Sequence, residues 1–439
     1  MLRTTFSHMA VLPEGVVPTR VVVDLRTGII ESLDPTSLPI DESCLLFPGF
    51  IDIHVHAREF VKPPDQIADQ IKKWELLCNK EVFLSAGHAA INGGVTCFAA
   101  MPNDPMPPDN ERRYGQKAAL AEQSQCPVIL FAAITETSEP WADLPYKVYL
   151  DAEPSHVSFS DWKTLEEVIK RYRRRRLFFH AEDPEILRNN SGYSEHWKKR
   201  PPEAEVRAVE NILNLTHKYD LLSHICHVST ESAVKLIGEY NNSSSTRVTC
   251  EVTPHHLFFS VDENGYLADG LRTDLPGFLL NCNPPIRSEG DRSSMIEALR
   301  SGTIQVLASD HAPHLLADKR LGAPGIPHLD TLGPFVGWLI KNCGFEPTRI
   351  AQILSEEPSN IMASNLQKKH GRIEKGYSAS LTLLDFDKTT EVVTIDGHAS
   401  NRKLFTRCGW SPFQNISLPA YVKLTVINGV SLDYGVDPQ

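Results

Sequence analysis

Four polar residues alternate with apolar residues in the segment FPGFIDIHVHARE, residues 47–59: Asp52, His54, His56 and Arg58. Successive side chains of a β-strand point to opposite faces of the sheet. The spacing therefore predicts a strand with one apolar face and one face that carries two imidazoles between a carboxylate and a guanidinium. Because unpaired polar groups are costly to bury, we expect this polar face to bind a partner.

Residues of the same chemical kind follow short apolar runs further along the chain. His180 follows LFF, His224 and His227 flank IC, and Asp310 follows IQVLAS. Lys147 lies inside the run YKVYL, where a lysine is unexpected. Taken singly, a strand histidine is more often a core residue, an aspartate before a turn is usually a cap, and a strand lysine often snorkels. Their repeated occurrence at strand ends indicates a shared site.

The elements that must position these residues alternate between residue 47 and residue 365. Short β-rich runs are separated by helix-like stretches, and the number of strands is about eight. This alternation predicts an α/β fold with a parallel (β/α)8 barrel, or TIM barrel. The predicted helices span residues 65–91, 109–124, 161–176, 203–218, 230–240, 290–301 and 347–363.

The two ends of the chain carry short β elements instead of this alternation. Examples are VVVDLRTGII near the start and ASLTLLDFD and AYVKLTVINGV near the end. We therefore predict a small β-sandwich domain formed from residues 1–46 and 366–439, which is interrupted by the barrel domain at residues 47–365.

Metal binding explains the polar residues at the strand ends. Side chains at the carboxyl ends of barrel strands meet at one mouth of the barrel. Imidazole and carboxylate ligands suit zinc and related divalent ions, and the set is larger than the ligand set of one catalytic zinc, which favours two ions. A buried ammonium beside two dications would be repelled. Lys147 fits such a site only if carbon dioxide converts it to a carbamate that bridges the ions.

Composition excludes several classes of protein. The formal net charge of −11 argues against a general nucleic-acid or anionic-membrane surface. No apolar run approaches the ~18 residues of a membrane span, and the N-terminal apolar stretch is too short for a secretory signal. The nine cysteines include no CxxC pair, so neither a disulfide framework nor a thiolate zinc site is indicated. We expect a reduced, cytoplasmic setting.

Several motifs together indicate a known family: PGFIDIHVHAR, AMPN, KVYL, HAED, HICHVS, CEVTPHHL, NPPIR and SDHAPH. In their order and approximate spacing they resemble the dihydroorotases, in the cyclic amidase branch of the amidohydrolase superfamily. The resemblance covers nearly the whole chain. It implies a zinc-dependent hydrolase that reversibly cyclises N-carbamoyl-L-aspartate to L-dihydroorotate in de novo pyrimidine biosynthesis.

The resemblance also implies two Zn²⁺ ions per subunit, bridged by carboxylated Lys147. A hydroxide between the ions would attack the ring amide carbonyl. Asp310 would act as the proton shuttle, passing the proton of this hydroxide to the leaving nitrogen. The implied ligands are His54, His56 and Asp310 for one ion, and His180 and His227 for the other.

The implied substrate carries a carboxylate. Arg58 lies two residues beyond the HxH pair, and its guanidinium would bind this carboxylate bidentately. Asn103 of AMPN and His314 of SDHAPH resemble the family's other carboxylate contacts. Asn283 and Arg287 of NPPIR are expected to add to the substrate pocket.

Three further residues are expected near the metal ligands. Asp52 is predicted to orient a histidine rather than to bind an ion. Glu251 and Cys226 match positions at which some family members hold an additional metal. The expected assembly is a homodimer, with association with aspartate transcarbamoylase, the preceding enzyme of the pathway, as a further partnership.

Three alternative functions differ in what they require of the sequence. An allantoinase or a dihydropyrimidinase would share the fold, the metals and the lysine, but the set of Arg58, Asn103 and His314 favours a carboxylated ring over a neutral one. A catalytically inactive scaffold for aspartate transcarbamoylase would have lost ligands, whereas every ligand position is filled. A phosphotriesterase-like hydrolase gives no reason for the carboxylate-binding set.

Overall fold

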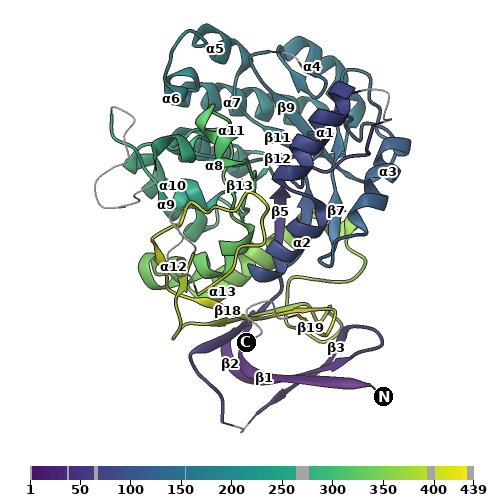
Figure 1. Ribbon diagram of the computed structural model, residues 1–439, viewed down its shortest axis with the longest axis vertical. Helices are drawn as coiled ribbons and strands as arrows, with labels where there is room; N and C mark the ends of the chain where they lie inside the picture. Colours follow the sequence, from purple (N-terminus) through teal and green to yellow (C-terminus); the bar gives the residue numbers. More distant parts are fainter. Residues whose placement is uncertain are drawn as a thin grey trace.

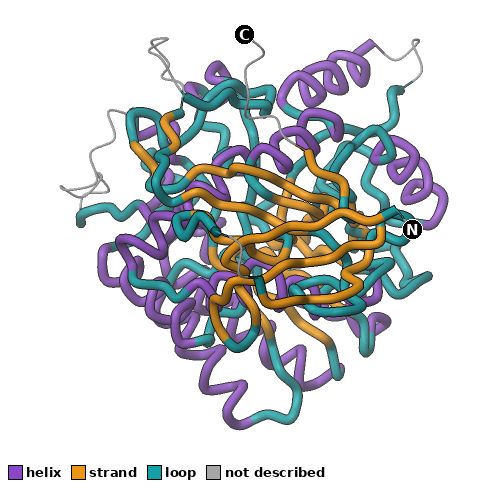
Figure 2. Tube along the Cα trace, turned by 90° about the horizontal axis from the view of Figure 1, so that it is seen from below, coloured by secondary structure: helices purple, strands orange, loops and turns teal. Residues whose placement is uncertain are grey.

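The computed structural model describes residues 2–36, 39–63, 68–153, 155–263, 276–392 and 401–432. Strands from both ends of the chain form one seven-stranded sheet in the order β19-β18-β15-β4-β1-β2-β3. Figure 1 shows this sheet at one end of the molecule, and Figure 2 shows it from below. Its strands are β1 (Arg3–Leu12), β2 (Gly15–Asp24), β3 (Ile29–Pro35), β4 (Cys44–Pro48), β15 (Leu381–Asp385), β18 (Tyr421–Ile427) and β19 (Val430–Leu432).

The rest of the molecule is α/β. Its strands pair in parallel, apart from β16 (Thr390–Glu391), which pairs antiparallel with β17 (Ser417–Leu418). One sheet has the order β5-β6-β7, and another has the order β10-β9-β11-β12-β13-β14, with β8 paired to β9. These strands are β5 (Phe50–Val55), β6 (Val95–Ala100), β7 (Val128–Leu130), β8 (Ala132–Ala133), β9 (Pro145–Leu150), β10 (Ser158–Phe159), β11 (Arg176–His180), β12 (Leu222–Ile225), β13 (Thr249–Val252) and β14 (Val306–Leu307).

Helices follow the parallel strands and surround them in Figure 1. Side-chain caps fix several helix starts: Asn110 accepts from the backbone N–H of Arg113, and Thr230 accepts from that of Ala233. The helices are α1 (Ala68–Lys80), α2 (Phe83–Asn92), α3 (Glu111–Ala121), α4 (Trp162–Ile169), α5 (Pro184–Asn189), α6 (His196–Lys199), α7 (Pro202–Tyr219), α8 (Glu231–Ser243), α9 (Pro254–Phe258), α10 (Glu289–Ser301), α11 (Leu316–Arg320), α12 (Leu332–Cys343), α13 (Pro347–Ala351) and α14 (Glu357–Ile361).

Three predicted helices differ from the observed ones. The stretch 65–91 forms two helices, α1 and α2, and its first residues lie outside the described part of the chain. The stretch 161–176 is helical only as far as Tyr172, because the chain turns at Arg174, which has a φ of 56°, and enters β11. The stretch 347–363 contains a π-helical segment at Gln352–Glu356, just before Pro358, whose missing N–H cannot continue the regular helical bonding.

The seven-stranded sheet has one hydrophobic cluster of its own, and it also contributes Phe47, Leu384 and Val422 to the core around the parallel strands. Phe6, Val21, Leu46 and Leu381 belong to a cluster of buried residues within the seven-stranded sheet. The largest cluster joins the parallel strands to the helices that cover them. The parallel strands are buried over almost their whole length, which explains their continuous apolar runs. Among the described residues, no helix is both long and apolar enough to span a membrane.

Candidate active site

Nine of the predicted site residues line one cavity of about 320 Å³ at the carboxyl ends of the parallel strands. Strands from distant parts of the sequence position these residues; β5, β11 and β12 are examples in Figure 1. The nine residues are His54, His56, Arg58, Asn103, His180, His227, Asn283, Asp310 and His314. Tyr149 and Asp151 also line the cavity, and the sequence motifs did not single them out.

The two histidines of the HxH pair converge on one carboxylate. Oδ1 of Asp310 lies 3.3 Å from Nε2 of His54 and 3.1 Å from Nε2 of His56. Strand β5 ends at Val55, so Arg58 does not reach the cavity by continued strand alternation. The chain turns instead at Arg58, where φ is 60°. This turn places the guanidinium over the same cavity as the imidazoles.

A second pair of histidines faces the first pair. Nδ1 of His180 lies 3.0 Å from Nε2 of His227, and the ring centroids of His54 and His227 are 5.3 Å apart. Nδ1 of His227 is buried and has no hydrogen-bond partner in the described part of the chain. Nitrogen atoms that face each other without an acceptor between them suit a bound cation.

Lys147 lies beneath the cavity and is fully buried. Its Nζ donates to Sγ of Cys226 at 2.8 Å and lies 5.2 Å from the ring centroid of Tyr149. A thiol is a weak acceptor for a buried ammonium. The position therefore suits a lysine whose charge is removed by chemical modification.

Each of three cavity histidines has a partner on the nitrogen that faces away from the centre. Nδ1 of His54 contacts Glu251, Nδ1 of His56 lies 2.8 Å from Oδ1 of Asn103, and Nε2 of His180 lies 2.9 Å from Oε2 of Glu182. Such contacts fix the tautomer and the ring orientation of a metal-ligating histidine. Glu182 was not identified from the sequence, although it lies two residues after His180 in the motif HAED.

Asp52 does not orient an imidazole ring. Its Oδ1 accepts from the backbone N–H of His54 at 3.1 Å and from that of Ser309 at 3.0 Å. The carboxylate on the ring of His54 belongs to Glu251, which also contacts Nε2 of His224 at 3.1 Å. The predicted role of Asp52 is therefore corrected: its Oδ1 joins the backbone of β5 to that of the segment after β14, instead of contacting an imidazole ring.

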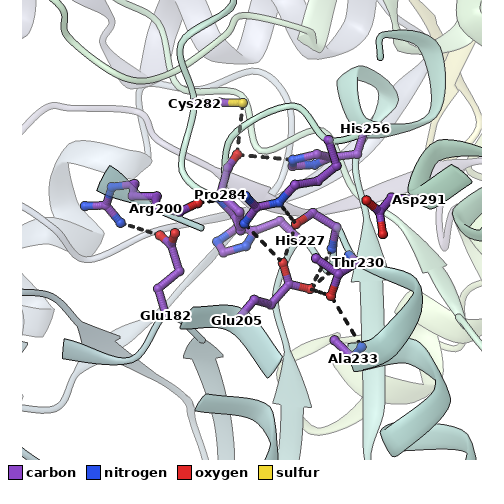
Figure 3. Close-up of polar contacts among 12 residues, drawn as sticks. Glu182, Arg200, Glu205, His227, Thr230, Ala233, His256, Cys282, Pro284 and Asp291 are labelled. Carbon is purple, nitrogen blue, oxygen red and sulfur yellow. Dashed lines mark hydrogen bonds and ion pairs between the residues drawn. The ribbon is translucent and has the colours of Figure 1, made fainter. Parts of the chain in front are cut away.

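Arg287 does not line the cavity, contrary to the expectation from NPPIR. Its Nε donates to Oγ of Ser229 at 3.1 Å, and its Nη1 donates to the backbone carbonyl of Arg200 at 2.7 Å. Figure 3 shows this buried network beside His227, with Glu182 pointing at Arg200. Acceptors away from the cavity hold Nε and Nη1 of Arg287, so we assign this residue a structural role.

Buried charges balance one another around the cavity. Burial would raise the pKa of Asp310, but the imidazoles of His54 and His56 outweigh burial and lower this pKa to about 2. Burial would likewise raise the pKa of Glu182, but Arg200 and His180 lower it to about 2. Both carboxyl groups are therefore ionised at neutral pH and can accept hydrogen bonds.

The backbone is strained at three cavity residues. Arg58, His227 and Asp310 have φ values of 60°, 36° and 44°. Non-glycine residues in this region cost about 1–3 kcal/mol each and cluster at functional sites. All three residues line the cavity, so the strained backbone lies at the candidate site.

The sequence matches a known protein family. The sequence profile of the amidohydrolase family matches residues 45–432. The chain belongs to the amidohydrolase family.

Curated relatives of this amidohydrolase are dihydroorotases. The dihydroorotase of Archaeoglobus fulgidus is 31% identical over 407 residues, which cover 89% of this chain and 88% of that protein. The dihydroorotase of Pyrococcus furiosus is 28% identical, covering 89% and 82%, and that of Ehrlichia canis is 29% identical, covering 93% and 88%. The resemblance to the dihydroorotases that the motifs indicate is thereby confirmed.

Solved structures of other cyclic amidases share the fold of this amidohydrolase. The L-hydantoinase (dihydropyrimidinase) of Arthrobacter aurescens superposes with a TM-score of 0.81 at 20% identity, covering 98% of this chain and 96% of that one. A D-hydantoinase superposes with a TM-score of 0.78 at 18% identity, covering 99% and 96%. At these identities the likeness supports the α/β fold alone.

The amidohydrolase cavity contains residues that fit divalent metal ions. Within the described residues, His54, His227 and Asp310 bring three ligand atoms to within 4.8 Å of one another, and so do His54, Cys226 and Glu251. These sets share His54, and Nδ1 of His227 has no hydrogen-bond partner in the described part of the chain. Imidazole and carboxylate donors in this arrangement suit zinc.

Proposed function

We propose that this amidohydrolase is a dihydroorotase, which interconverts N-carbamoyl-L-aspartate and L-dihydroorotate in pyrimidine biosynthesis. The observation that most strongly supports this proposal is the pairing of Arg58 with His314 in the same cavity as Asp310. Nη2 of Arg58 lies 3.1 Å from Nε2 of His314. Such a pair is suited to a carboxylate, which distinguishes dihydroorotate from the uncharged rings of related cyclic amides.

We also propose that the parallel strands close into a (β/α)8 barrel, with a β-sandwich domain formed by residues 1–46 and 366–439 around residues 47–365. Contacts between β5 and the segment after β14 support closure. The backbone N–H of His56 donates to the carbonyl of His311 at 2.8 Å, and that of His311 donates to the carbonyl of His54 at 3.2 Å. These bonds join the first parallel strand to the end of the last.

The proposed cofactor is a pair of Zn²⁺ ions, which Lys147, as a carbamate, would help to hold. The buried position of Lys147 near His54 and Cys226 supports this assignment. When bound, the ions supply an acidified water and polarise the ring carbonyl. The proposed ligands are His54, His56 and Asp310 for one ion, and His180 and His227 for the other.

Residues of this chain would bind the substrate and transfer a proton between water and the ring nitrogen. Arg58, Asn103 and His314 would hold the substrate carboxylate and so set the position of the ring, and Asn283 would add to the pocket. In ring opening, the oxygen of water bonds to the amide carbon, and the bond from this carbon to the ring nitrogen breaks. Asp310 takes the proton from the water and delivers it to the leaving nitrogen. Cyclisation reverses these steps, with Asp310 accepting the proton from the nitrogen that closes the ring.

The deciding experiment is ring opening of L-dihydroorotate by zinc-supplemented protein, followed by ultraviolet absorbance. Dihydrouracil and allantoin serve as uncharged comparison substrates. We expect turnover of dihydroorotate alone. Turnover of a neutral ring instead would refute dihydroorotate as the substrate but would still support cyclic amidase activity. If the metal-loaded protein turned over none of the three substrates, a role as a scaffold would be favoured.

Substitution of Arg58 tests the carboxylate contact directly. Arg58→Ala removes the guanidinium, so the KM for dihydroorotate should rise by about two orders of magnitude, as expected for a buried charged hydrogen bond. The matched control is Arg113→Ala, in which an exposed arginine of α3 is removed. An unchanged KM in Arg58→Ala would show that another residue binds the carboxylate.

A further inference from the structure

His314 lies between two cationic side chains. Nη2 of Arg58 is 3.1 Å from its Nε2, and Nζ of Lys80 is 3.3 Å from its Nδ1. Neither guanidinium nor ammonium nitrogen can accept a hydrogen bond. Both cations therefore offer only donors to the same imidazole.

The imidazole of His314 cannot satisfy both donors. Burial, together with Arg58 and Lys80, holds its pKa well below the ordinary value, so the ring is neutral. A neutral imidazole has one nitrogen that accepts and one N–H that donates. One of the two contacts is therefore a hydrogen bond, and the other brings two donors together with no acceptor between them.

The surroundings favour Lys80 as the true donor to His314. Lys80 is the last residue of α1 and is only 6% exposed. Its Nζ also lies 3.2 Å from Oδ2 of Asp318, which anchors the ammonium next to Nδ1. On the opposite side, Nε of Arg58 is buried without a hydrogen-bond partner in the described part of the chain.

Packing fixes the position of His314 relative to Lys80. Nε1 of Trp410 donates to the backbone carbonyl of His314 at 2.7 Å. A Cβ placed on Gly325 would lie 3.1 Å from Cδ2 of the imidazole, so the backbone at this glycine packs directly on the ring. The ring thus presents Nδ1 to Lys80 and Nε2 to the cavity, where His314 is part of the lining and Lys80 is not.

We propose that Lys80 is a positioning residue that fixes the tautomer of His314, so that Nε2–H and the guanidinium of Arg58 both donate to the carboxylate of the substrate. In the free protein these two donors face each other at 3.1 Å. A carboxylate oxygen that accepts from both donors supplies the missing acceptor. Lys80 thereby contributes to selection of a carboxylated ring without touching it. This inference rests on the proposed function, because it concerns the same cavity.

The test compares binding of orotate and uracil to zinc-loaded protein by titration calorimetry. These planar rings differ only in the carboxylate. Lys80→Met keeps the apolar stem but removes the donor, so the Kd for orotate should rise about tenfold while the Kd for uracil stays within twofold. The KM for dihydroorotate should rise by a similar factor, with kcat changed less than about threefold.

Two further variants complete the design. Lys73→Met removes an exposed lysine of the same helix and should leave both ligands unaffected. Asp318→Asn leaves Lys80 in place but weakens its anchor, and should raise the Kd for orotate about threefold. It provides a second measurement if Lys80→Met does not fold.

The outcomes separate this inference from the proposed function. Wild-type protein that binds uracil as tightly as orotate would refute the carboxylate pocket, and the inference with it. Wild-type protein that prefers orotate, together with unchanged orotate binding in Lys80→Met and Asp318→Asn, would refute the inference alone. Equal weakening of orotate and uracil would also overturn it, because a general disturbance of the cavity would then explain the loss.

Discussion

At the residue scale, the cavity histidines differ in which nitrogen they turn inward. His54 and His56 direct Nε2 toward Asp310, whereas His180 directs Nδ1 toward His227. The partner on the outer nitrogen decides this orientation: Glu251, Asn103 or Glu182. These partners are as much part of the candidate site as the imidazoles, because a ring that rotates cannot hold an ion in fixed geometry.

Glu182→Gln tests this orienting role. The amide keeps the size of the side chain but removes the charge that accepts from His180, so affinity for zinc should fall about 10–100-fold. Competition with a chromophoric chelator measures the loss. The matched control is Glu185→Gln on α5, where an exposed glutamate contacts Arg207 instead. Undiminished zinc affinity in Glu182→Gln would show that His180 is oriented by other contacts.

Lys147→Ala tests the proposed carbamate bridge. Removal of the bridging group should lose zinc and activity together, because the remaining ligands cannot hold two dications close together. A short carboxylic acid, such as acetate or propionate, should restore part of both by entering the space that the side chain leaves. Zinc content by atomic absorption, measured beside turnover, checks the result. A variant with full zinc content and full turnover would exclude Lys147 as a bridge.

At the element scale, the packing of helices on the seven-stranded sheet depends on close backbone approach. Gly337 lies inside α12, and a Cβ at this position would lie 2.6 Å from Cβ of Ala420 and 2.7 Å from its backbone nitrogen. Gly115 also lies inside a helix, α3, but a Cβ there would meet nothing within 4 Å. The same substitution should therefore have opposite effects at the two positions.

Gly115→Ala should stabilise the protein by about 0.5–1 kcal/mol, because alanine has the higher helix propensity. Gly337→Ala should destabilise it by about 1–3 kcal/mol, because overpacking outweighs that gain. Thermal unfolding followed by circular dichroism measures both variants. A higher melting temperature for Gly337→Ala would show that α12 moves away from Ala420 at little cost.

At the scale of the whole molecule, many histidines are buried in their neutral form, and acid must therefore weaken the fold. Burial and the nearby Lys368 lower the pKa of His370 to about 4. Below pH 6.5 the unfolded chain takes up a proton at this residue, whereas the folded protein does so only near pH 4. The stability present above pH 6.5 is therefore lost as the pH falls, by up to about 1.4 kcal/mol per pH unit.

His370→Gln should remove this contribution. The free energy of unfolding should then fall less steeply between pH 6.5 and pH 4, by the equivalent of up to about one proton. Urea denaturation at several pH values measures the slope. His217→Gln, which replaces an exposed histidine of α7, should leave the slope unchanged. An identical slope for His370→Gln and wild type would mean that His370 is already charged in the folded protein.

Local sequence patterns were sufficient to predict many of the strands and helices of this molecule. Period-two alternation marked β5, and the apolar runs before His180 and His227 marked β11 and β12. The ends of helices were less accurate, as at residues 161–176, because the turn at Arg174 has no strong local signal. The sequence also named nine of the residues that line the cavity. The strand-end histidines and Asp310 stand out after apolar runs, whereas Asn103, Asn283 and His314 were implied by the family resemblance.

The sequence by itself determined which side chains are available and at which strand ends they occur, because alternation and apolar runs are properties of neighbouring residues. Only the tertiary structure decided which of them meet. Lys80 and His314 are 234 positions apart, and His54 and Glu251 are 197 positions apart. Arg287 and Asp52 were assigned other roles from sequence, because their hydrogen-bond partners depend on how strands pair across the sheet. Pairing over such separations is decided by burial of the whole core, which no local pattern records.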